Sequence, residues 1–593
     1  LPEAFAIVHP RHPQGDYPFG DLAGVGVAFK VATALLGELP IELLDLVAIG
    51  TIADLVSLTD ENRTFVKMGL QMIQTGDRIG LDVLLQEAGV KKEAVSEESI
   101  GFTIGPRLNA LGRLGEAAPG VELMTTFDEE QALEIAKYID QQNNERKDIV
   151  TTIAKEALDL IDPNAPVHIL AKQGWHEGVL GIVAGRIMQE TGKPTIILAI
   201  DESGTTAKGS GRSISALNLY EALNEVREQF THFGGHHMAA GMTLPVENIP
   251  FVQEHLSHFI EKNQIDMANG QELLISESLA VSQATTTFID QLRILAPFGT
   301  DNTVPTFVFK EITPTQIRKI GADNAHLKFQ MNQEGAQLDA IAFQMGPQAD
   351  ELAQGTADVA GQLSINEWNG RKKPQLMVTD FAVSGRQLFD FRGKNNQTKP
   401  IPSEATAYLL FDEKNQKFIS DPTANIIVWS NQEELVEAVS QNQIEQLVFV
   451  DCPVEAITVK EIVEATEIQR IYMMFISPEE AYLNGMASRE QFATLYKFIL
   501  QQKEVNLRSQ LSKVANYLNI QEKLLIFMIQ VFFDLGFVTI ESGVLNSIEK
   551  PDNRPLTESQ VYQQRLKKIK TEEFLLYSDC QTIQQWLWNE EDK

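Results

Sequence analysis

Four short segments of the chain contain residue types that can bind phosphate or a metal ion. The first is AIGTIADLVSL, residues 48–58, in which Asp54 interrupts an apolar run. A carboxylate in apolar surroundings is costly unless it caps a helix, forms an ion pair or binds a metal ion. On this segment alone, we favour a helix N-cap over a metal ligand for Asp54.

The second segment is IGPRLNALGRLG, residues 104–115, which places Arg107, Asn109 and Arg113 among glycines. Arginine offers a planar fork for phosphate oxygens, and glycine lets a backbone come close to a ligand. A loop with surface arginines explains this pattern equally well.

The third segment is KGSGRSI, residues 208–214, which follows a predicted strand ending at Ile200. Successive amides in a Gly/Ser turn form a nest for anions, and Ser210 and Arg212 could close on a terminal phosphate. The P-loop spacing GxxxxGK(S/T) is absent, so hydrolysis of nucleoside triphosphates is not indicated.

The fourth segment is FGGHHMAAG, residues 233–241, where two glycines and two histidines precede small residues. This order predicts a tight turn entering a helix, with the imidazoles facing a ligand. His176 and Glu177 do not belong to an HExxH zinc motif, because residue 180 is Leu.

These segments need elements that hold them in place, and the chain predicts an α/β protein of several domains. Small residues are frequent in 20–58, which predicts helices packed closely on a sheet. Helical spacing of apolar residues over 128–162 predicts a long helix joining two domains. Beyond it, strands at 167–171 and 194–200 flank a helix at 178–190, which together form a βαβ unit.

Residues 300–385 predict a small barrel of the oligonucleotide-binding type. Five runs have the pattern of strands, at 306–309, 326–331, 337–343, 357–365 and 374–383, with turns at 332–335 and at Asn369-Gly370. A basic stretch with interleaved aromatic residues adjoins them, as in proteins that bind single strands. Its members are Arg371, Lys372, Lys373, Arg386, Arg392, Lys394 and Lys399, with Trp368, Phe381, Phe389 and Phe391. A solvated barrel edge with core aromatics is an equal alternative.

Residues from about 400 onward predict a second α/β module, with strands at 408–411, 425–429, 446–450 and 470–475. Residues 511–548 have the pattern of two helices followed by a hairpin. That order is compatible with a winged helix, although many small modules share it.

The composition limits the kinds of partner. Lys and Arg total 49 against 81 Asp and Glu, a net charge of −32, so bulk attraction to nucleic acid is excluded and a polyanion must bind in local grooves. The two cysteines, Cys452 and Cys580, cannot form a Cys-rich zinc site and suit a reducing cytosol. No apolar run reaches the ~18 residues of a membrane span. We therefore expect a cytoplasmic protein without a membrane partner.

Seven motifs occur in an order that resembles the RecJ family of bacterial single-strand-specific exonucleases, in the DHH phosphoesterase superfamily. They are GVGVAFK (24–30), IGTIADLV (49–56), IGPRLNALGR (104–113), WHEGVLGIVAGRI (175–187), GSGRSI (209–214), FGGHHMAAGM (233–242) and PFGTDNTVPTF (297–307). The resemblance covers essentially residues 1–390. The remainder is similar to the additional domain of family members from Gram-positive bacteria.

The resemblance implies a multidomain α/β fold in five parts. These are the C-terminal part of a DHH domain (1–127), a connecting helix (128–162), a DHH-associated α/β domain (163–265), an oligonucleotide-binding barrel (270–395) and a C-terminal α/β plus helical domain (400–593). It also implies 5′-to-3′ hydrolysis of single-stranded DNA to mononucleotides with two Mn²⁺ or Mg²⁺ ions, in DNA repair and recombination. A single-strand-binding protein and a RecQ-type helicase are the implied protein partners.

The resemblance also assigns roles to residues. Asp54 matches a metal-binding aspartate, which reverses the preference for a helix cap. Arg107 matches an arginine that contacts the substrate beside the metals, and His236 lies in a motif that holds DNA phosphate there. These three residues are the expected catalytic group. The expected substrate-binding residues are Asn109, Arg113, Ser210, Arg212, Gly234, Gly235, Arg371, Lys372 and Lys373, with Ser210 and Arg212 matching a pocket for the 5′-phosphate.

One departure from the family pattern matters. The other metal motifs of the family, including the Asp-His-His triplet, do not occur in this chain, which opens with Leu-Pro-Glu. Two-metal hydrolysis needs several carboxylates and imidazoles. We therefore expect an incomplete part of a longer exonuclease, which by itself binds DNA weakly and cleaves nothing. The alternatives are a catalytically silent DNA-binding scaffold and a DHH-family phosphodiesterase for oligonucleotides or cyclic dinucleotides. The barrel and the additional domain argue against the second alternative.

Overall fold

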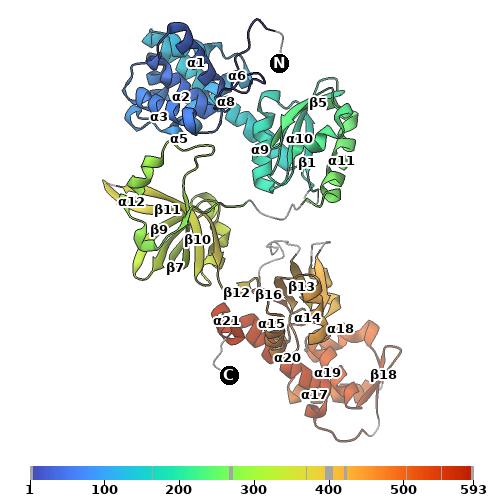
Figure 1. The fold of residues 1–593 in the computed structure, drawn as a ribbon. Helices are drawn as coiled ribbons and strands as arrows, with labels where there is room; N and C mark the ends of the chain where they lie inside the picture. The colour runs from blue at the N-terminus through green and yellow to red at the C-terminus, as the bar shows by residue number, and fades with distance from the viewer. Residues whose placement is uncertain are drawn as a thin grey trace. The chain divides into compact units, whose positions relative to one another are not determined.

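The computed structural model divides the chain into two compact units (Figure 1). The first comprises Leu1–Glu277, Thr285–Phe307 and Glu367–Lys373, and the second comprises Ser278–Ala284, Val308–Asn366 and Pro374–Lys593. The structure describes residues 4–162, 165–265, 272–368, 370–393, 405–419, 424–502, 504–548 and 551–588. Among these residues, no helix combines the length and the apolar character needed to cross a lipid bilayer.

The first part of unit 1 is helical. Its main helices are α1 (Gly24–Leu36), α2 (Leu44–Ala53), α3 (Asp60–Thr75), α4 (Ile79–Glu87), α6 (Gly105–Leu114) and α7 (Ala118–Thr125). The small residues serve contacts between helices rather than contacts with a sheet, because a Cβ on Gly50 of α2 would lie 2.7 Å from Val25 Cγ1 of α1. The prediction of helices on a sheet is therefore wrong for described residues 4–162, which contain no strand.

The predicted connecting helix is confirmed as α8 (Glu129–Leu158), a single helix of 30 residues. The Asp128 side chain caps it by accepting hydrogen bonds from the amides of Glu130 and Gln131. Ala132, Ala136 and Ile139 pack into the core of the helical part, and Val150, Ile153 and Ala157 pack into the next core. This helix thus contributes to two successive hydrophobic cores.

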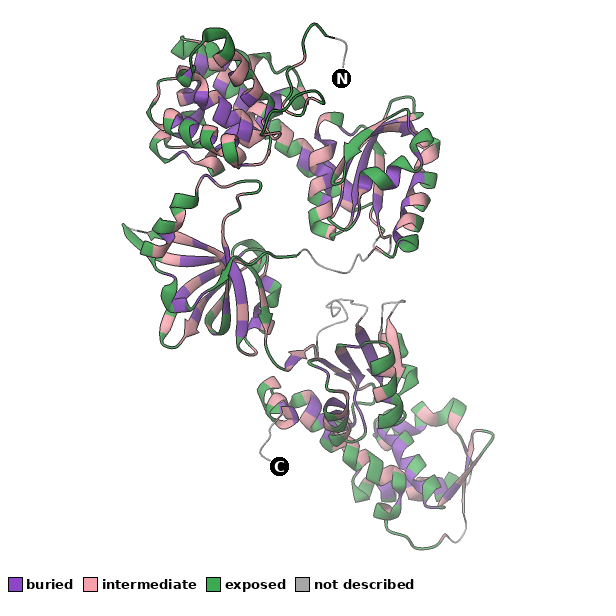
Figure 2. Ribbon diagram, viewed as in Figure 1, coloured by how far each residue is buried: buried purple, intermediate pink, exposed green. Residues whose placement is uncertain are grey.

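The second part of unit 1 is an α/β domain, as the βαβ pattern predicts. Its sheet has the order β1-β2-β3-β5-β4. The strands are β1 (His168–Gln173), β2 (Thr195–Ile200), β3 (Thr206–Arg212), β4 (His232–His236) and β5 (Ala239–Pro245). Only β1 and β2 pair in parallel, and the other pairings are antiparallel. Helix α9 (Leu180–Thr191) packs on β2 and β3, while α10 (Leu219–Asn224) and α11 (Ile249–Lys262) share the core with apolar residues of β2 (Figure 2).

The predicted barrel is also present. Strands β6 (Glu277–Ser278), β7 (Thr306–Ile320), β8 (His326–Gln333), β9 (Ala336–Ala342), β10 (Ala357–Trp368) and β11 (Arg371–Val383) form one sheet, which the pairing of β10 with β7 closes. The turn predicted at Asn369 lies outside the described residues.

The C-terminal part contains the second α/β module and the small helical module that were predicted. Parallel pairings join the strands in the order β12-β16-β15-β13-β14, with β12 (Gln387–Asp390), β13 (Thr406–Leu410), β14 (Asn425–Val428), β15 (Gln446–Asp451) and β16 (Arg470–Ile476). The helical module follows with α17 (Arg489–Gln502), β17 (Glu504–Asn506), α18 (Leu507–Leu518), α19 (Glu522–Asp534), β18 (Val538–Glu541) and β19 (Val544–Ser547). The predicted fold class, a multidomain α/β protein with a DHH-associated domain and an oligonucleotide-binding barrel, is confirmed.

Candidate nucleic-acid interface

Ser210 and Arg212 lie on β3, between β2 and β5. The predicted Gly/Ser turn with a nest of amides is therefore wrong, because these residues belong to a strand that pairs on both sides. The glycines are required by crowding: a Cβ on Gly209 would lie 1.9 Å from the Ile197 carbonyl oxygen, and one on Gly211 would lie 2.8 Å from Leu219 Cδ2. Since side chains alternate along a strand, Ser210 and Arg212 share one face of the sheet.

The N-terminal turn of α9 lies against these two side chains. Arg212 Nη1 donates to Ser210 Oγ at 2.9 Å. A Cβ on Gly181 would lie 2.8 Å from Arg212 Nη2 and 3.2 Å from Ser210 Oγ, so only glycine leaves room for this arrangement. Burial lowers the pKa of Arg212, and the charge of Arg113 lowers it further. A helix N-terminus beside a guanidinium and a hydroxyl suits an anion.

Gly234, Gly235 and His236 lie in the hairpin of β4 and β5. The predicted turn into a helix is wrong, because a strand, β5, follows it. Ser210 pairs with Gly241, which pairs with Gly234, and Arg212 pairs with Ala239, which pairs with His236. Residues directly opposite in neighbouring strands share a face, and strands lie about 4.8 Å apart. His236 and Arg212 are therefore on the same face of the sheet, with backbones about 10 Å apart.

Arg107, Asn109 and Arg113 lie on helix α6, so the alternative of a loop with surface arginines is wrong. Arg107 forms an ion pair with Asp140 of α8 at 3.0 Å and donates to the Thr103 carbonyl oxygen. Arg113 instead donates to the Gly178 carbonyl oxygen at 3.2 Å, in the turn that precedes α9. Asn109 is exposed. Of the two arginines, Arg113 is thus directed to the α/β domain without an acidic partner among the described residues.

Asp54 is the C-cap of α2, and its amide donates to the Gly50 carbonyl oxygen at 3.0 Å. The helix N-cap reading is wrong, and so is the premise of burial, because Asp54 is exposed. A carboxylate at the negative end of a helix dipole is unfavourable for folding. Its position therefore gives no structural reason for an aspartate, and its role as a metal ligand stays a prediction.

The segment Pro297–Asn302 holds the turn that follows Asp54, a feature that local sequence patterns did not reveal. Thr300 Oγ1 donates to the Leu55 carbonyl oxygen at 2.9 Å, and the Leu58 amide donates to the Thr300 carbonyl oxygen at 2.7 Å. Asn302 Nδ2 donates to the carbonyl oxygens of Leu295 and Pro297. Leu55 has a φ of 58°, which β-carbon sterics disfavour, so the turn needs such support.

Cations of the predicted basic stretch lie in two different parts of the fold, the barrel and the C-terminal module. Arg371, Lys372 and Lys373 are exposed at the start of β11, where Lys372 lies 3.7 Å from Glu367. Arg392, in contrast, binds Asp390 and the carbonyl oxygens of Leu575 and Ser578. It is structural.

Some aromatic rings of the basic stretch are packed against other side chains and are not available to stack on DNA bases. The Phe389 ring stacks on Tyr472 at a centroid distance of 4.7 Å, and Phe391 packs in the same cluster. These two rings therefore belong to a core, as the alternative stated above required. Lys394, Lys399 and the Trp368 side chain lie outside the described residues.

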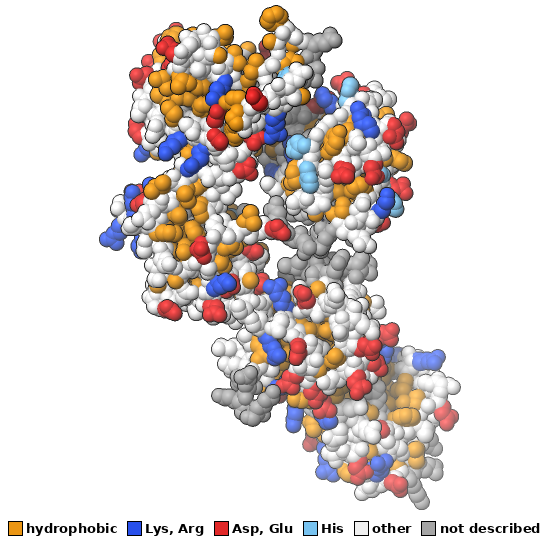
Figure 3. Space-filling model, in the orientation of Figure 1, with side chains coloured by type: hydrophobic (Ala, Val, Ile, Leu, Met, Phe, Trp, Pro, Cys, Tyr) orange, Lys and Arg blue, Asp and Glu red, His pale blue; other side chains and the backbone are white. Residues whose placement is uncertain are grey.

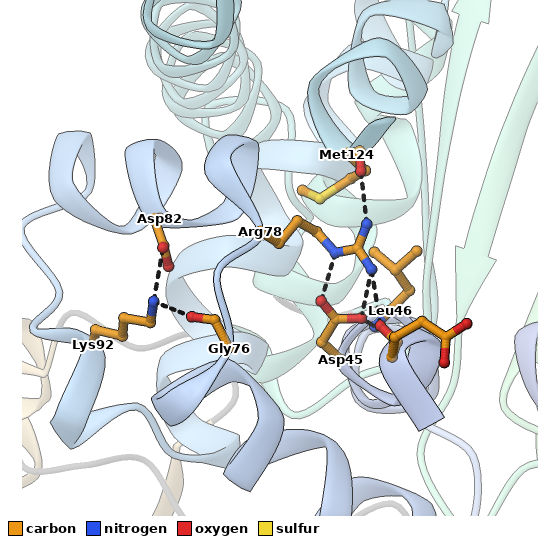
Figure 4. A network of polar contacts seen from close by, with 8 residues as sticks. Asp45, Leu46, Gly76, Arg78, Asp82, Lys92 and Met124 are labelled. Atoms are coloured by element: carbon orange, nitrogen blue, oxygen red, sulfur yellow. Dashed lines mark hydrogen bonds and ion pairs between the residues drawn. The ribbon is translucent and has the colours of Figure 1, made fainter. Parts of the chain in front are cut away.

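A cavity of about 510 Å³ opens elsewhere in the helical part, beside the polar network in Figure 4. There Arg78 binds Asp45 and the carbonyl oxygens of Met124 and Glu42, while Lys92 binds Asp82. These charges neutralise one another and tie α2, α4 and α7 together. None of the predicted site residues lines this cavity.

The donors needed for two metal ions are not assembled in the described part of the chain. No group of three or more His, Cys, Asp or Glu side chains there could hold an ion. Asp54 is also not joined to Arg212 or His236 by a hydrogen bond or an ion pair within that part. The residues described do not by themselves fit a two-metal centre. What they do assemble is a group of donors on α9, β3 and β4 whose charge suits an anion.

Comparison with known proteins agrees with this architecture. The family model for the C-terminal domain of single-strand DNA-specific exonuclease matches residues 387–587, the RecJ OB domain matches 275–380, and the DHHA1 domain matches 164–262. The crystal structure of RecJ from Thermus thermophilus in complex with Mg²⁺ superposes with a TM-score of 0.55 at 23% identity, covering 88% of this chain and 78% of that one. That similarity shows a shared fold.

Curated relatives extend the match along the whole chain. The single-stranded-DNA-specific exonuclease RecJ of Bacillus subtilis is 38% identical, covering 99% of this chain and 76% of the relative. RecJ of Escherichia coli is 32% identical, covering 64% of this chain and 70% of the relative. The chain therefore belongs to the RecJ family of single-stranded-DNA-specific exonucleases.

Proposed function

We propose that this chain holds the 5′ end of single-stranded DNA for hydrolysis from 5′ to 3′. The observation that carries the proposal is the arrangement of Ser210, Arg212 and His236 on one sheet face beside the N-terminus of α9. Among the described residues, Arg212 has no carboxylate partner, so its charge is available to a phosphate. A terminal phosphate anchored there would set the polarity of degradation.

The barrel would hold the strand further from its end. Arg371, Lys372 and Lys373 are exposed cations on an oligonucleotide-binding barrel, which is a fold that tracks the backbone of single strands. Because the chain as a whole is acidic, we expect these exposed cations to confine the attraction for DNA to this edge of the barrel. We assign these three residues to phosphate contacts.

Hydrolysis would use divalent ions, in keeping with the Thermus thermophilus RecJ structures in complex with Mg²⁺ and with Mn²⁺. Two such ions, if bound, would activate water and stabilise the charge of the leaving oxygen. Asp54 is the residue of this chain assigned to hold one of them. A two-metal centre would require ligands beyond those that the described residues bring together. Arg107 and His236 would hold phosphate oxygens near that centre.

We place this activity in the repair and recombination of DNA in the cytoplasm, with a single-strand-binding protein and a RecQ-type helicase as partners. The support for this setting is membership of the family.

A catalytically silent DNA-binding scaffold is the second candidate. Its support is the lack of a metal-binding group in the described part of the chain. The test extends the chain at its N-terminus with the metal motifs of the family that do not occur in it, incubates this extended form with 5′-labelled single-stranded DNA and Mn²⁺, and compares it with the same form carrying Asp54→Asn. Release of labelled mononucleotides by the extended form, and not by its Asp54→Asn variant, supports the exonuclease. Binding without release in both proteins supports the scaffold, and degradation from the 3′ end contradicts the proposed polarity.

A further inference from the structure

The cavity beside Arg78 is lined by none of the residues that we assign to DNA or metal. Its wall is largely apolar. Ile73 of α3 and Leu81 of α4 form the buried part, each only 2% exposed, and the half-buried Met72 and Met124 line it further. Methionine side chains are flexible and adapt to partners of different shape. A recess of about 510 Å³ with such a wall is large enough for several side chains of a bound partner.

Phe127 lines the same cavity and is 92% exposed, so the core of the helical part does not use its ring. It precedes Asp128, the N-cap of α8. A hydrophobic residue at this place often packs on the fourth residue of the helix, here Ala132, but Ala132 is fully buried among other apolar side chains. An exposed aromatic ring next to an apolar recess is typical of a contact with another protein.

The cations at this cavity are already neutralised. The Arg78 guanidinium donates to both carboxylate oxygens of Asp45 and to two backbone carbonyl oxygens, as Figure 4 shows. Lys92, the second cation of the network, binds Asp82. Neither side chain is therefore available to an anion, and both ion pairs hold the surrounding helices in a fixed arrangement.

Two acidic side chains of the cavity, in contrast, have no cation. Glu42 and Asp77 line it, are exposed and form no ion pair within the described ranges. Glu129 and Glu130, which closely follow Phe127 in the sequence, are also exposed and unpaired in that part of the chain. Negative charge around an apolar recess attracts a basic partner and repels DNA.

We propose that this cavity binds a basic segment of another protein, which inserts a large apolar side chain beside Phe127 and places lysine or arginine near Glu42 and Asp77. In such an interface the buried apolar contact supplies most of the affinity, while the charges speed the encounter and exclude acidic partners. The inference does not rest on the proposed function, because it uses different residues.

The test selects short random peptides displayed on phage, with the chain as bait and Phe127→Ser as the counterselection. We expect enriched peptides that combine one aromatic or long aliphatic residue with several lysines or arginines. Synthetic copies are then titrated by fluorescence anisotropy. Phe127→Ser should weaken their binding about tenfold or more, the usual effect of removing a central apolar contact. Asp77→Lys should weaken it about fivefold, because like charges then face each other.

The matched controls lie in the same unit but do not line the cavity. Phe251→Ser removes an exposed ring of α11, and Glu87→Lys reverses an exposed charge of α4. Both should leave the affinity for the peptides unchanged. All four replaced side chains are exposed, so we expect the variants to fold, and thermal unfolding checks this.

Several results would overturn the inference. They are the absence of enrichment, enrichment of acidic peptides or of peptides without an apolar residue, and equal binding by wild type and Phe127→Ser. Displacement of a bound peptide by single-stranded DNA would assign the surface to DNA. Self-association that is lost in Phe127→Ser, measured by analytical ultracentrifugation, would assign it to a second copy. Loss of peptide binding in the N-terminally extended form would assign the cavity to the added segment. None of these results contradicts the proposed exonuclease.

Discussion

Arginine side chains of the first unit differ in what neutralises them, and this difference ranks the candidate residues. Arg107, predicted as a catalytic residue, already has Asp140 as a partner at 3.0 Å. Arg113 and Arg212 have none among the described residues. A phosphate that binds Arg107 must compete with Asp140, whereas one that binds Arg212 need not. The sequence alone could not show that Arg107 is paired, because Arg107 and Asp140 are 33 residues apart and lie on two different helices.

Removing that competition should strengthen DNA binding. We expect Asp140→Asn to raise the affinity for single-stranded DNA and to steepen its dependence on salt by about 0.7 in the logarithmic slope, since one more cation meets a phosphate. Anisotropy titrations over a range of salt concentrations measure both quantities. Asp148→Asn, an exposed acid on the same helix, changes the net charge equally and should have a smaller effect. Identical effects of the two variants would show that only net charge matters.

The two thiols are expected to be unreactive in the folded protein. Burial raises the pKa of Cys452 to about 12, with the nearby Glu572 adding to the shift, and burial also raises the pKa of Cys580. Because the thiolate is the reactive form, a thiol reagent at pH 8 should modify neither residue until the protein is unfolded. For a thiol with a raised pKa, the native state loses stability as pH rises from about 9 towards 12. Rapid labelling of Cys452 under native conditions would contradict its placement in the core.

At the scale of elements, periodic segments were predictable and glycine-rich ones were not. Helix α8 follows from apolar spacing over many turns, and β2 follows from a run of buried residues. The glycines around Ser210 favoured a turn because turns are where Gly and Ser are most frequent. In the fold, Gly209 and Gly211 are strand residues next to Ile197 and Leu219, a contact that becomes visible only when the sheet has formed.

The candidate site was predictable to a similar extent. Family motifs pointed to Ser210, Arg212 and His236, and the strand register now places the three on one face. The support that Pro297–Asn302 gives to the turn after Asp54 was missed, because it joins segments 245 residues apart in the chain.

The segment Pro297–Asn302 gives an element-scale prediction about the turn that carries Asp54. Thr300→Val removes the hydrogen bond to the Leu55 carbonyl oxygen, which should cost about 1 kcal/mol locally. We expect faster hydrogen exchange at the Leu58 amide, which donates to the Thr300 backbone, with little change in global unfolding. Thr303→Val is the matched control, because Thr303 is exposed and makes no side-chain hydrogen bond within the described part of the chain. Unchanged exchange at Leu58 would show that the turn does not depend on Thr300.

At the scale of the whole molecule, negative charge restricts where DNA can bind. Lys and Arg occur singly or in small groups among acidic side chains on the face drawn in Figure 3. The C-terminal helical module has the element order of a winged helix, yet the charges of α19 are used internally. Lys523 binds Glu480, Glu522 accepts from Ser512, and Asp534 caps α20 (Gln560–Tyr577). Helix α19 therefore offers no free cation to phosphates, and the cations that we assign to DNA are Arg113, Arg212 and those at the start of β11.

That restriction predicts a modest dependence of binding on salt. Single strands release counterions with a slope of about −0.7 per phosphate contact, so Arg113 and Arg212 give about −1.4 and three further cations on β11 bring the slope to about −3.5. We expect wild type near the larger value and the combined variant Arg371→Gln, Lys372→Gln and Lys373→Gln near the smaller one. Lys523→Gln, on α19, should leave the slope unchanged. A slope much steeper than about −3.5 would require phosphate contacts on surfaces other than these two, because each additional contact has to be made by another cation.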